Sequence, residues 1–162
     1  MGPWSKPIKS ITKAITATYC PDNASAGELA EVTRIDDLVT LLANLRADSI
    51  DNKVEAVVLK RQGGNELTYV QVNGGVALGW VASPLLSFHT LGEINATGYM
   101  GFRYLGLDAE VPKSYIISPE VAMNAATAFI KTGVPGVRHL TWEQDPAWTT
   151  FFRQEQPGGG LS

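Results

Sequence analysis

Three β-rich runs in the middle of the chain, separated only by short glycine-containing turns, place the strongest limit on its fold. The runs cover residues 54–61, 67–72 and 76–82. Their separators, 63–65 (Gly-Gly-Asn) and 73–75 (Asn-Gly-Gly), supply residues that accept the positive φ angles of tight hairpins. The pattern predicts an antiparallel β-meander, which Pro84 ends and which a strand at 85–91 can extend.

Upstream of the meander, the sequence predicts one strand and one helix. Residues 11–19 are rich in Ile, Thr and Tyr, as strands are, and a turn-forming stretch follows at 21–27. Thr33 and Asp36 approximate a capping box at the start of a helix that we expect to end near Asp48. Its leucines recur at i, i+3, i+4 and i+7, the spacing of an amphipathic helix: Leu38, Leu41, Leu42 and Leu45.

A second helix, nearer the C-terminus, has clearly marked ends. Ser118 is suited to cap it, and Pro119 takes the first helical position, where a missing N–H costs nothing. Gly133 suits the left-handed conformation after the last turn, and Pro135 forbids continuation, so a short strand is expected at 137–142. One face is small and apolar: Val121, Ala122, Ala125, Ala126 and Phe129. The sequence therefore predicts the α+β class, an antiparallel β-meander sheet packed with two amphipathic helices.

The end of this helix and the segment after it resemble a known family. The Thr-Gly-Val-Pro stop at 132–135 and the Leu-Thr-Trp at 140–142 resemble the C-terminal signature of the Imm-type immunity proteins, the large first family of that series, found in bacterial polymorphic toxin systems. Residues 98–102, Gly-Tyr-Met-Gly-Phe, are similar to that family's Tyr-Met-Gly-aromatic motif. The chain departs from the family at 96–98, where an acidic residue is common, and at Val134, where a basic one is common.

The resemblance implies a cytoplasmic antidote that binds a cognate toxin. Several toxins paired with this family are deaminases that act on cytosine in DNA. The implied partner is thus the catalytic domain of a nucleic-acid-targeting deaminase, which the antidote neutralises by blocking its active site.

Composition and charge set the broad class. The 162-residue, 17.4-kDa chain is expected to form a single domain over 1–155, followed by a flexible Gly-rich tail at 156–162. Its net charge of −3 argues against direct binding to nucleic acid. Cys20 is the only cysteine, and no apolar run is long enough for a signal peptide or a membrane span. We therefore expect a cytoplasmic protein without a membrane partner.

Candidates for enzyme chemistry are few. Cys20 could be a nucleophile with His89 or His139 as its base, but a lone cysteine at a strand end is more typical of a core residue. The two histidines lack metal-ligand spacing, and the carboxylates of Asp36 and Asp37 favour the dipole of a helix N-terminus. We expect no enzyme, no cofactor and no metal. Two alternatives stay open: a non-enzymatic adaptor or scaffold domain of a secretion or toxin-related assembly, and a small hydrolase using Cys20.

The stretch 92–114 has little periodicity and is expected to be an irregular loop. It combines aromatic, Met and Arg side chains, which are enriched at interface hot spots, with acidic residues that suit a basic partner. The candidate partner-binding residues are Glu93, Tyr99, Phe102, Arg103, Asp108 and Glu110. A second interpretation stays open, in which 98–101 is a structural turn whose aromatic residue fills the core.

The remaining large aromatic residues are assigned by position. Trp142, beside the small-residue helix, is expected in the core, whereas Trp80 is left open. Trp148, Phe151 and Phe152 either cover an open edge of the core or form an exposed interface patch.

Overall fold

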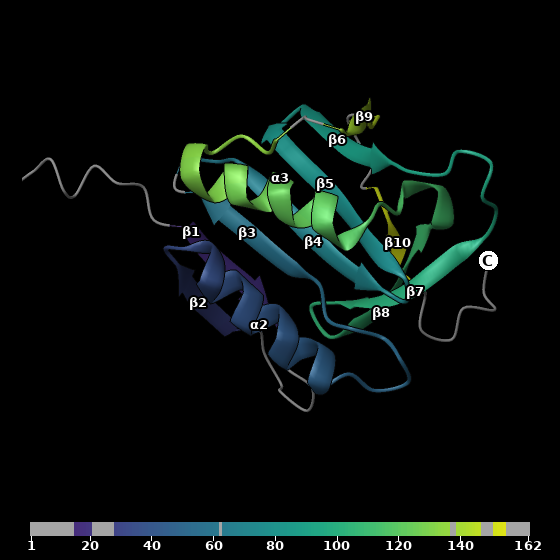
Figure 1. Cartoon of the computed structure of the whole chain (residues 1–162), viewed down its shortest axis with the longest axis horizontal. Helices are drawn as coiled ribbons and strands as arrows, with labels where there is room; N and C mark the ends of the chain where they lie inside the picture. The colour runs from purple at the N-terminus through teal and green to yellow at the C-terminus, as the bar shows by residue number, and fades with distance from the viewer. Residues whose placement is uncertain (1–14, 21–27, 62, 137–138, 147–150, 155–162) are drawn as a thin grey trace, which may run out of the picture.

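A seven-stranded antiparallel sheet, counted over the described residues, forms the centre of the molecule (Figure 1). The computed structural model describes residues 15–20, 28–61, 63–136, 139–146 and 151–154. The strands follow the order β2-β1-β3-β4-β5-β6-β9 across the sheet. Their bounds are β1 Ile15–Tyr19, β2 Glu28–Val32, β3 Val57–Arg61, β4 Glu66–Val72, β5 Gly75–Ser83, β6 Leu86–Leu91 and β9 Thr141–Gln144.

The predicted meander is confirmed. β3, β4, β5 and β6 pair in sequence order, each antiparallel to the next. Gly64 has a φ of 117° and Gly74 a φ of 91°, as the turns between these strands require. The first strand is confirmed over residues 15–19, whereas 11–14 and the predicted turn at 21–27 lie outside the described residues. The sequence analysis missed β2, which pairs with β1 at one edge of the sheet.

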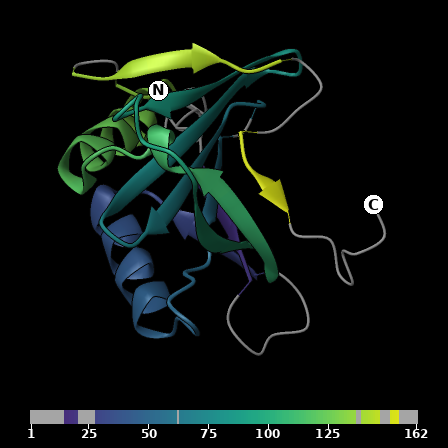
Figure 2. The same ribbon diagram turned by 90° about the vertical axis from the view of Figure 1, so that its right-hand side faces the viewer.

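Two helices, α2 (Ile35–Ala47) and α3 (Pro119–Thr132), cover one face of this sheet (Figure 2). Their buried side chains join Leu59, Leu67 and Leu78 of the sheet in the main core. Close packing of α3 is possible because its inner face consists of small residues and one large ring, Ala122, Ala125, Ala126 and Phe129. The predicted α+β class is confirmed.

The predicted ends of α3 are also confirmed. The Oγ of Ser118 accepts a hydrogen bond from the backbone N–H of Val121 at 3.2 Å, and Gly133 adopts a φ of 84°. The predicted capping of α2 was wrong by one residue, because Arg34 is the N-cap. Asp37 Oδ2 accepts the backbone N–H of Thr33 at 2.9 Å and that of Arg34 at 3.1 Å. The reason is geometric. In a capping box the side chain of the third helical residue bonds back to the N-cap, and with Arg34 as the N-cap this residue is Asp37, not Asp36.

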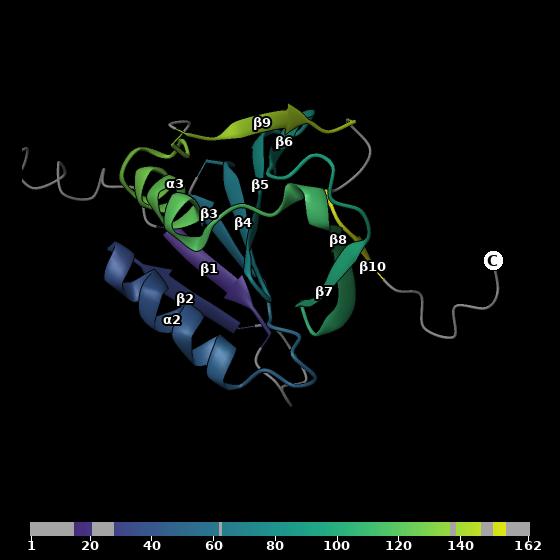
Figure 3. The same ribbon diagram turned by 45° about the vertical axis from the view of Figure 1, so that its right-hand side comes forward.

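A second, three-stranded sheet packs on the other face of the main sheet (Figure 3). It contains β7 (Tyr99–Tyr104), β8 (Leu107–Pro112) and β10 (Arg153–Gln154), in the order β10-β8-β7. A short 3-10 helix, η2 (Lys113–Tyr115), follows β8. The inner residues of the small sheet pack with one end of the main sheet in a second core: Val70, Val72, Ala77, Phe102, Ala109, Val111 and Phe151.

The prediction of an irregular loop at 92–114 was therefore wrong. The segment 99–112 is a β-hairpin, whose two-residue turn places Leu105 at a φ of 51° and Gly106 at 83°. These paired positive φ angles match the twist of an antiparallel hairpin. A strand is usually recognised by alternation of apolar and polar residues. Here the alternation was not visible in the sequence, because aromatic residues occur on both faces: Tyr99 on the outer face, and Phe102 and Tyr104 on the inner face.

The terminal strand also differs from the prediction. β9 covers Thr141–Gln144, and of the strand expected at 137–142, residues 137–138 lie outside the described part of the chain. His139 has a φ of 61°, in the left-handed region, so it lies outside the strand in which it was expected. No helix within the described residues has the length and apolar character that a membrane crossing requires.

Candidate functional site

The outer face of the small sheet gathers four of the six residues predicted to bind a partner. Successive residues of a strand point to opposite sides, and Phe102, Ala109 and Val111 point inward. The residues between them lie on the opposite, outer side: Tyr99, Arg103, Asp108 and Glu110. Arg103 lies directly across from Asp108, and Glu110 across from Gly101. We call this surface the hairpin face.

Two of the predicted residues are not part of the hairpin face. Phe102 was predicted at the interface, but its side chain is 0% exposed and fills the second core. The alternative interpretation, in which 98–101 is a turn whose aromatic residue fills the core, was wrong, because Tyr99 is 44% exposed and begins β7. Glu93 lies in an exposed turn after β6, where its carboxylate accepts the N–H of Asn95.

The acidic side chains of the hairpin face have cationic neighbours in this chain. Asp108 lies 3.4 Å from the Nζ of Lys53 and 3.8 Å from the Nε of Arg103. Glu110 accepts a hydrogen bond from the Nε of Arg153 on β10 at 2.9 Å. The guanidinium of Arg153 also lies over the ring of Tyr99, 3.7 Å from its centroid. The hairpin face therefore carries both positive and negative charges. Its acidic residues were expected to suit a basic partner, but Lys53 and Arg153, from segments distant in the sequence, already lie beside them.

Glu55 is hydrogen-bonded to the turn of the hairpin. Its side chain is buried, with the residue 4% exposed. One carboxylate oxygen accepts the backbone N–H of Gly106 at 3.1 Å, and the other accepts that of Cys20 at 2.7 Å. Ala56 and Val54 also bond to the backbone of Arg103 on β7. Hydrogen bonds to an ionised acceptor are about twice as strong as neutral ones, so the tip is preorganised.

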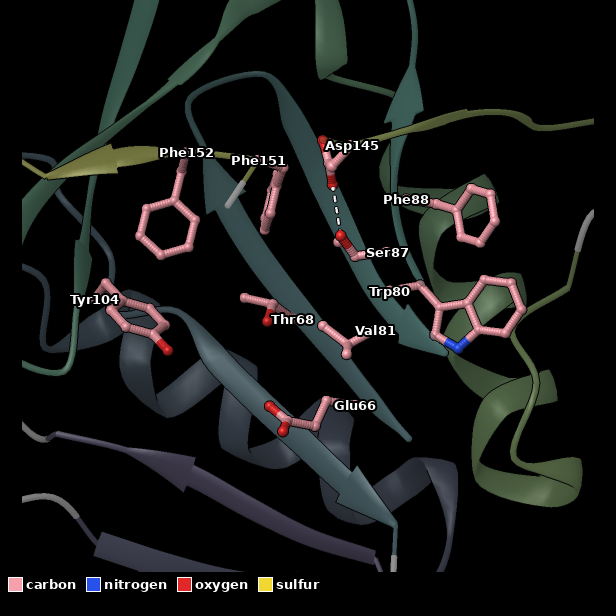
Figure 4. A pocket seen from close by; sticks show the side chains of 11 residues that line it. Glu66, Thr68, Trp80, Val81, Ser87, Phe88, Tyr104, Asp145, Phe151 and Phe152 are labelled. Atoms are coloured by element: carbon pink, nitrogen blue, oxygen red, sulfur yellow. Dashed lines mark hydrogen bonds between the residues drawn. The ribbon is translucent and has the colours of Figure 1, made fainter. Parts of the chain in front are cut away.

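An aromatic cavity of 170 Å³ opens between the small sheet and the open end of the main sheet (Figure 4). Tyr104, Phe151 and Phe152 form one wall, as Figure 4 shows. The sheet supplies the rest of the lining: Glu66, Thr68, Gly79, Trp80, Val81, Ser87, Phe88 and Asp145. We call this site the aromatic cavity.

Phe151 sits directly on Gly79, and this contact places the aromatic wall. A Cβ at Gly79 would collide with the Phe151 ring, so only glycine leaves room for it. Phe151 is 8% exposed, and its ring centroid lies 5.3 Å from that of Phe152. Of the two interpretations of the C-terminal aromatic residues, cover of the core holds for Phe151. Phe152 is half-buried and faces the cavity, and Trp148 lies outside the described residues.

Glu66 gives the aromatic cavity an uncompensated negative charge. It is half-buried, and no cation within the described part of the chain forms an ion pair with it. Its cross-strand neighbour Lys60 is exposed and also forms none there. The pKa of Tyr104 is raised, first by its burial and then by the negative charges of Glu66 and Glu55.

A buried histidine contacts Asp145, one of the residues that line the cavity. The Nδ1 of His89 lies 2.6 Å from Asp145 and its Nε2 lies 2.8 Å from Glu143, while the ring stacks on Tyr115 at 3.7 Å. Asp145 also accepts a hydrogen bond from the hydroxyl of Ser87 at 3.5 Å. These contacts fasten the end of β9 to β6 and satisfy the carboxylate of Asp145.

The groups of the hydrolase considered from sequence make the following contacts among the described residues. Both ring nitrogens of His89 face carboxylates, and the Ser87 hydroxyl approaches Asp145, not the ring. Cys20 is buried, with its backbone N–H held by Glu55, and His139 lies in an exposed turn. Among the described residues, no group of three or more His, Cys, Asp or Glu could hold a metal ion.

The two tryptophans within the described residues, Trp80 and Trp142, pack on the helix-covered side of the main sheet. Trp80 and Trp142 are half-buried and pack against the main core, and the ring of Trp80 stacks on Phe88 with centroids 5.4 Å apart. The core assignment of Trp142 is thus confirmed, and Trp80, which was left open, joins it.

The described residues thus form an α+β domain with a hairpin face and an adjoining aromatic cavity. A family model of immunity proteins, described as Immunity protein Imm1, matches residues 26–144. The chain belongs to the Imm1 immunity protein family, whose role is protection against a toxin. A search of curated proteins gave no match. The matched region includes the hairpin, but it ends before Asp145, Phe151 and Arg153.

Proposed function

We propose that this protein binds the catalytic domain of a cognate toxin through the hairpin face and blocks access to its active site. The observation that carries the proposal is the convergence of Tyr99, Arg103, Asp108 and Glu110 on one exposed face of a hairpin. Membership of an immunity family gives the partner class, and the hairpin gives a surface of the residue types that dominate interfaces.

The chemistry of the hairpin face suits tight and specific binding. On the hairpin face, the ring of Tyr99 is 44% exposed and lies beside the paired charges of Arg153 and Glu110. Apolar anchors with a charged rim are the usual anatomy of such an interface. Because Glu55 and β10 already hold the hairpin in place, little conformational entropy is lost on binding.

Neutralisation requires that almost no toxin remains free. A nanomolar dissociation constant corresponds to about 12 kcal/mol of binding free energy, and a standard-size interface can provide it. We propose that the antidote acts in the cytoplasm and without catalysis, because covering an active site needs only steric exclusion. The proposed target is a deaminase that acts on nucleic acid.

The direct test uses the toxin domain encoded beside this gene. Purified toxin domain is assayed for conversion of cytosine to uracil in single-stranded DNA, with and without one equivalent of this protein. Calorimetry then measures the dissociation constant. We expect loss of deamination and a nanomolar constant. No complex and unaltered toxicity on co-expression would reject the proposal, and inhibition of a toxin with another activity would reject the deaminase assignment.

A matched pair of variants tests the surface. Tyr99→Asp places a charge on the hairpin face at a residue that is 44% exposed, and we expect the dissociation constant to rise by about 30-fold or more, as for a hot spot. Leu29→Asp introduces the same charge at a leucine that is 73% exposed on β2, at the edge of the main sheet, and should leave affinity unchanged. Equal affinity of the two variants would place the interface elsewhere.

A further inference from the structure

We infer that the aromatic cavity receives one arginine side chain of the toxin, as a second anchor beside the hairpin face. This inference rests on the proposed function, because it supposes that the partner is a protein bound at this end of the molecule. It adds a site and a ligand chemistry that the hairpin face does not supply.

Charge is the first argument. The lining of the cavity contains two carboxylates, Glu66 and Asp145, and no lysine or arginine among the described residues. Asp145 already faces the ring of His89, whereas Glu66 has no ion pair in the described chain. A half-buried carboxylate next to aromatic rings is stabilised most by a cation that enters from outside. On the hairpin face, by contrast, Asp108 and Glu110 already have cationic partners.

The aromatic wall selects the kind of cation. Tyr104 and Phe152 lie with ring centroids 4.7 Å apart, and the hydroxyl of Tyr104 points toward the side of the cavity where Glu66 lies (Figure 4). A planar guanidinium can stack on such rings and bond a carboxylate with its fork of N–H groups, which an ammonium cannot do. The chain uses this pairing nearby, where Arg153 lies over Tyr99 and bonds to Glu110.

The size of the cavity limits the occupant to one side chain. Its volume is 170 Å³, close to the roughly 150 Å³ of an engineered cavity that binds benzene. A side chain of arginine size fits this space, whereas an extended peptide segment does not.

The position of the cavity makes it accessible to the same toxin. β10 carries Arg153 to the hairpin face and the preceding Phe152 to the cavity, so one strand borders both surfaces. A partner that crosses the β10 edge of the small sheet meets them together. Asp145, Phe151 and Phe152 also follow the region matched by the family model, so the cavity is built partly by residues that the family match does not include.

The first experiment needs no toxin. The ¹⁵N-labelled protein is titrated with N-acetylarginine methylamide, and with the norleucine and lysine analogues as controls. We expect the amide signals of Gly79 and Val81 to shift with the arginine probe, to shift less with lysine and not with norleucine, and to stay in place for Glu66→Gln. An equal response to norleucine, a lysine response as large as that of arginine, or no shift at tens of millimolar would overturn the inference.

The second experiment uses the complex. Glu66→Gln keeps the shape of the side chain and removes its charge, and we expect the toxin dissociation constant to rise about tenfold or more through a faster off-rate. Glu120→Gln makes the same change on α3, across the main sheet, and should have no effect. Unchanged melting temperatures show that both variants are folded.

The outcomes separate the two proposals. If the wild-type protein binds no toxin, the proposed function fails, whatever the probe titration shows. If it binds toxin and Glu66→Gln binds equally well, only the arginine site is refuted.

Discussion

Replacing Glu55 should both destabilise the protein and loosen the tip of the hairpin. The buried carboxylate accepts the backbone N–H groups of Gly106 and Cys20. A hydrogen bond to a charged group contributes about 1.5–3 kcal/mol. Glu55→Gln keeps one acceptor oxygen and turns an amide N–H₂ toward the other donor, so the expected loss is one such bond, about 1.5–3 kcal/mol. Glu55→Ala loses both, about 3–6 kcal/mol.

These losses are measurable against the total stability expected of a domain, about 5–15 kcal/mol. Urea unfolding followed by tryptophan fluorescence gives the free energy, and hydrogen exchange reports on the amide of Gly106, which should exchange faster in Glu55→Gln. Glu31→Gln, the same change at an exposed position on β2, is the control and should stay within about 0.5 kcal/mol of wild type.

The reasoning fails if Glu55→Gln is as stable as this control, or if the Gly106 amide keeps its protection. Either result would mean that the buried carboxylate does not hold the hairpin. If the hairpin face binds the toxin, the same variant should also weaken binding, because the tip must then be ordered on association.

Three further predictions concern single contacts. Backbone hydrogen bonds from Thr33 and Arg34 lower the pKa of Asp37, so its stabilising effect is complete above the unfolded-state pKa and is lost as pH falls through the folded-state pKa. Urea melts of wild type and Asp37→Asn should therefore differ most at neutral pH and converge in acid, and a gap that persists at low pH would contradict this. His89→Ala removes the ring that contacts Asp145 and leaves that buried carboxylate with the Ser87 hydroxyl, which should cost about 1–3 kcal/mol by the same assay, whereas a loss under about 0.5 kcal/mol would show that the pair is not structural. Gly79→Val should displace the Phe151 ring and cost about 1–3 kcal/mol by overpacking, and a crystal structure with that ring in place would refute the reasoning.

Some elements could be predicted because the residues that determine them are neighbours in the sequence. α3 has its cap, its proline and its terminal glycine within one segment, and the meander has a glycine turn at each reversal. Such signals act over a few residues, so no distant contact is needed to interpret them. β2 was missed because Glu28–Val32 is a short edge strand with little burial, which takes its conformation from pairing with β1.

The candidate site was only partly predictable for the same reason. The residue types of 93–110 pointed to an interface, and Tyr99, Arg103, Asp108 and Glu110 do share one face. The cations that pair with the acidic side chains come from Lys53 and Arg153, some fifty residues away on either side. No short sequence pattern carries that information, because a salt bridge depends on distance in space and not along the chain.

The amino-acid order alone settled the ends of α3, the meander and the small-residue face that lies on the sheet, since each follows from neighbours a few positions apart. Tertiary structure decided which aromatic residue is buried and which is presented, where charge remains unpaired, and that Phe151 reaches Gly79 to wall a cavity. These outcomes depend on packing between strands far apart in sequence, whose burial and electrostatic energies exist only once the two sheets have come together.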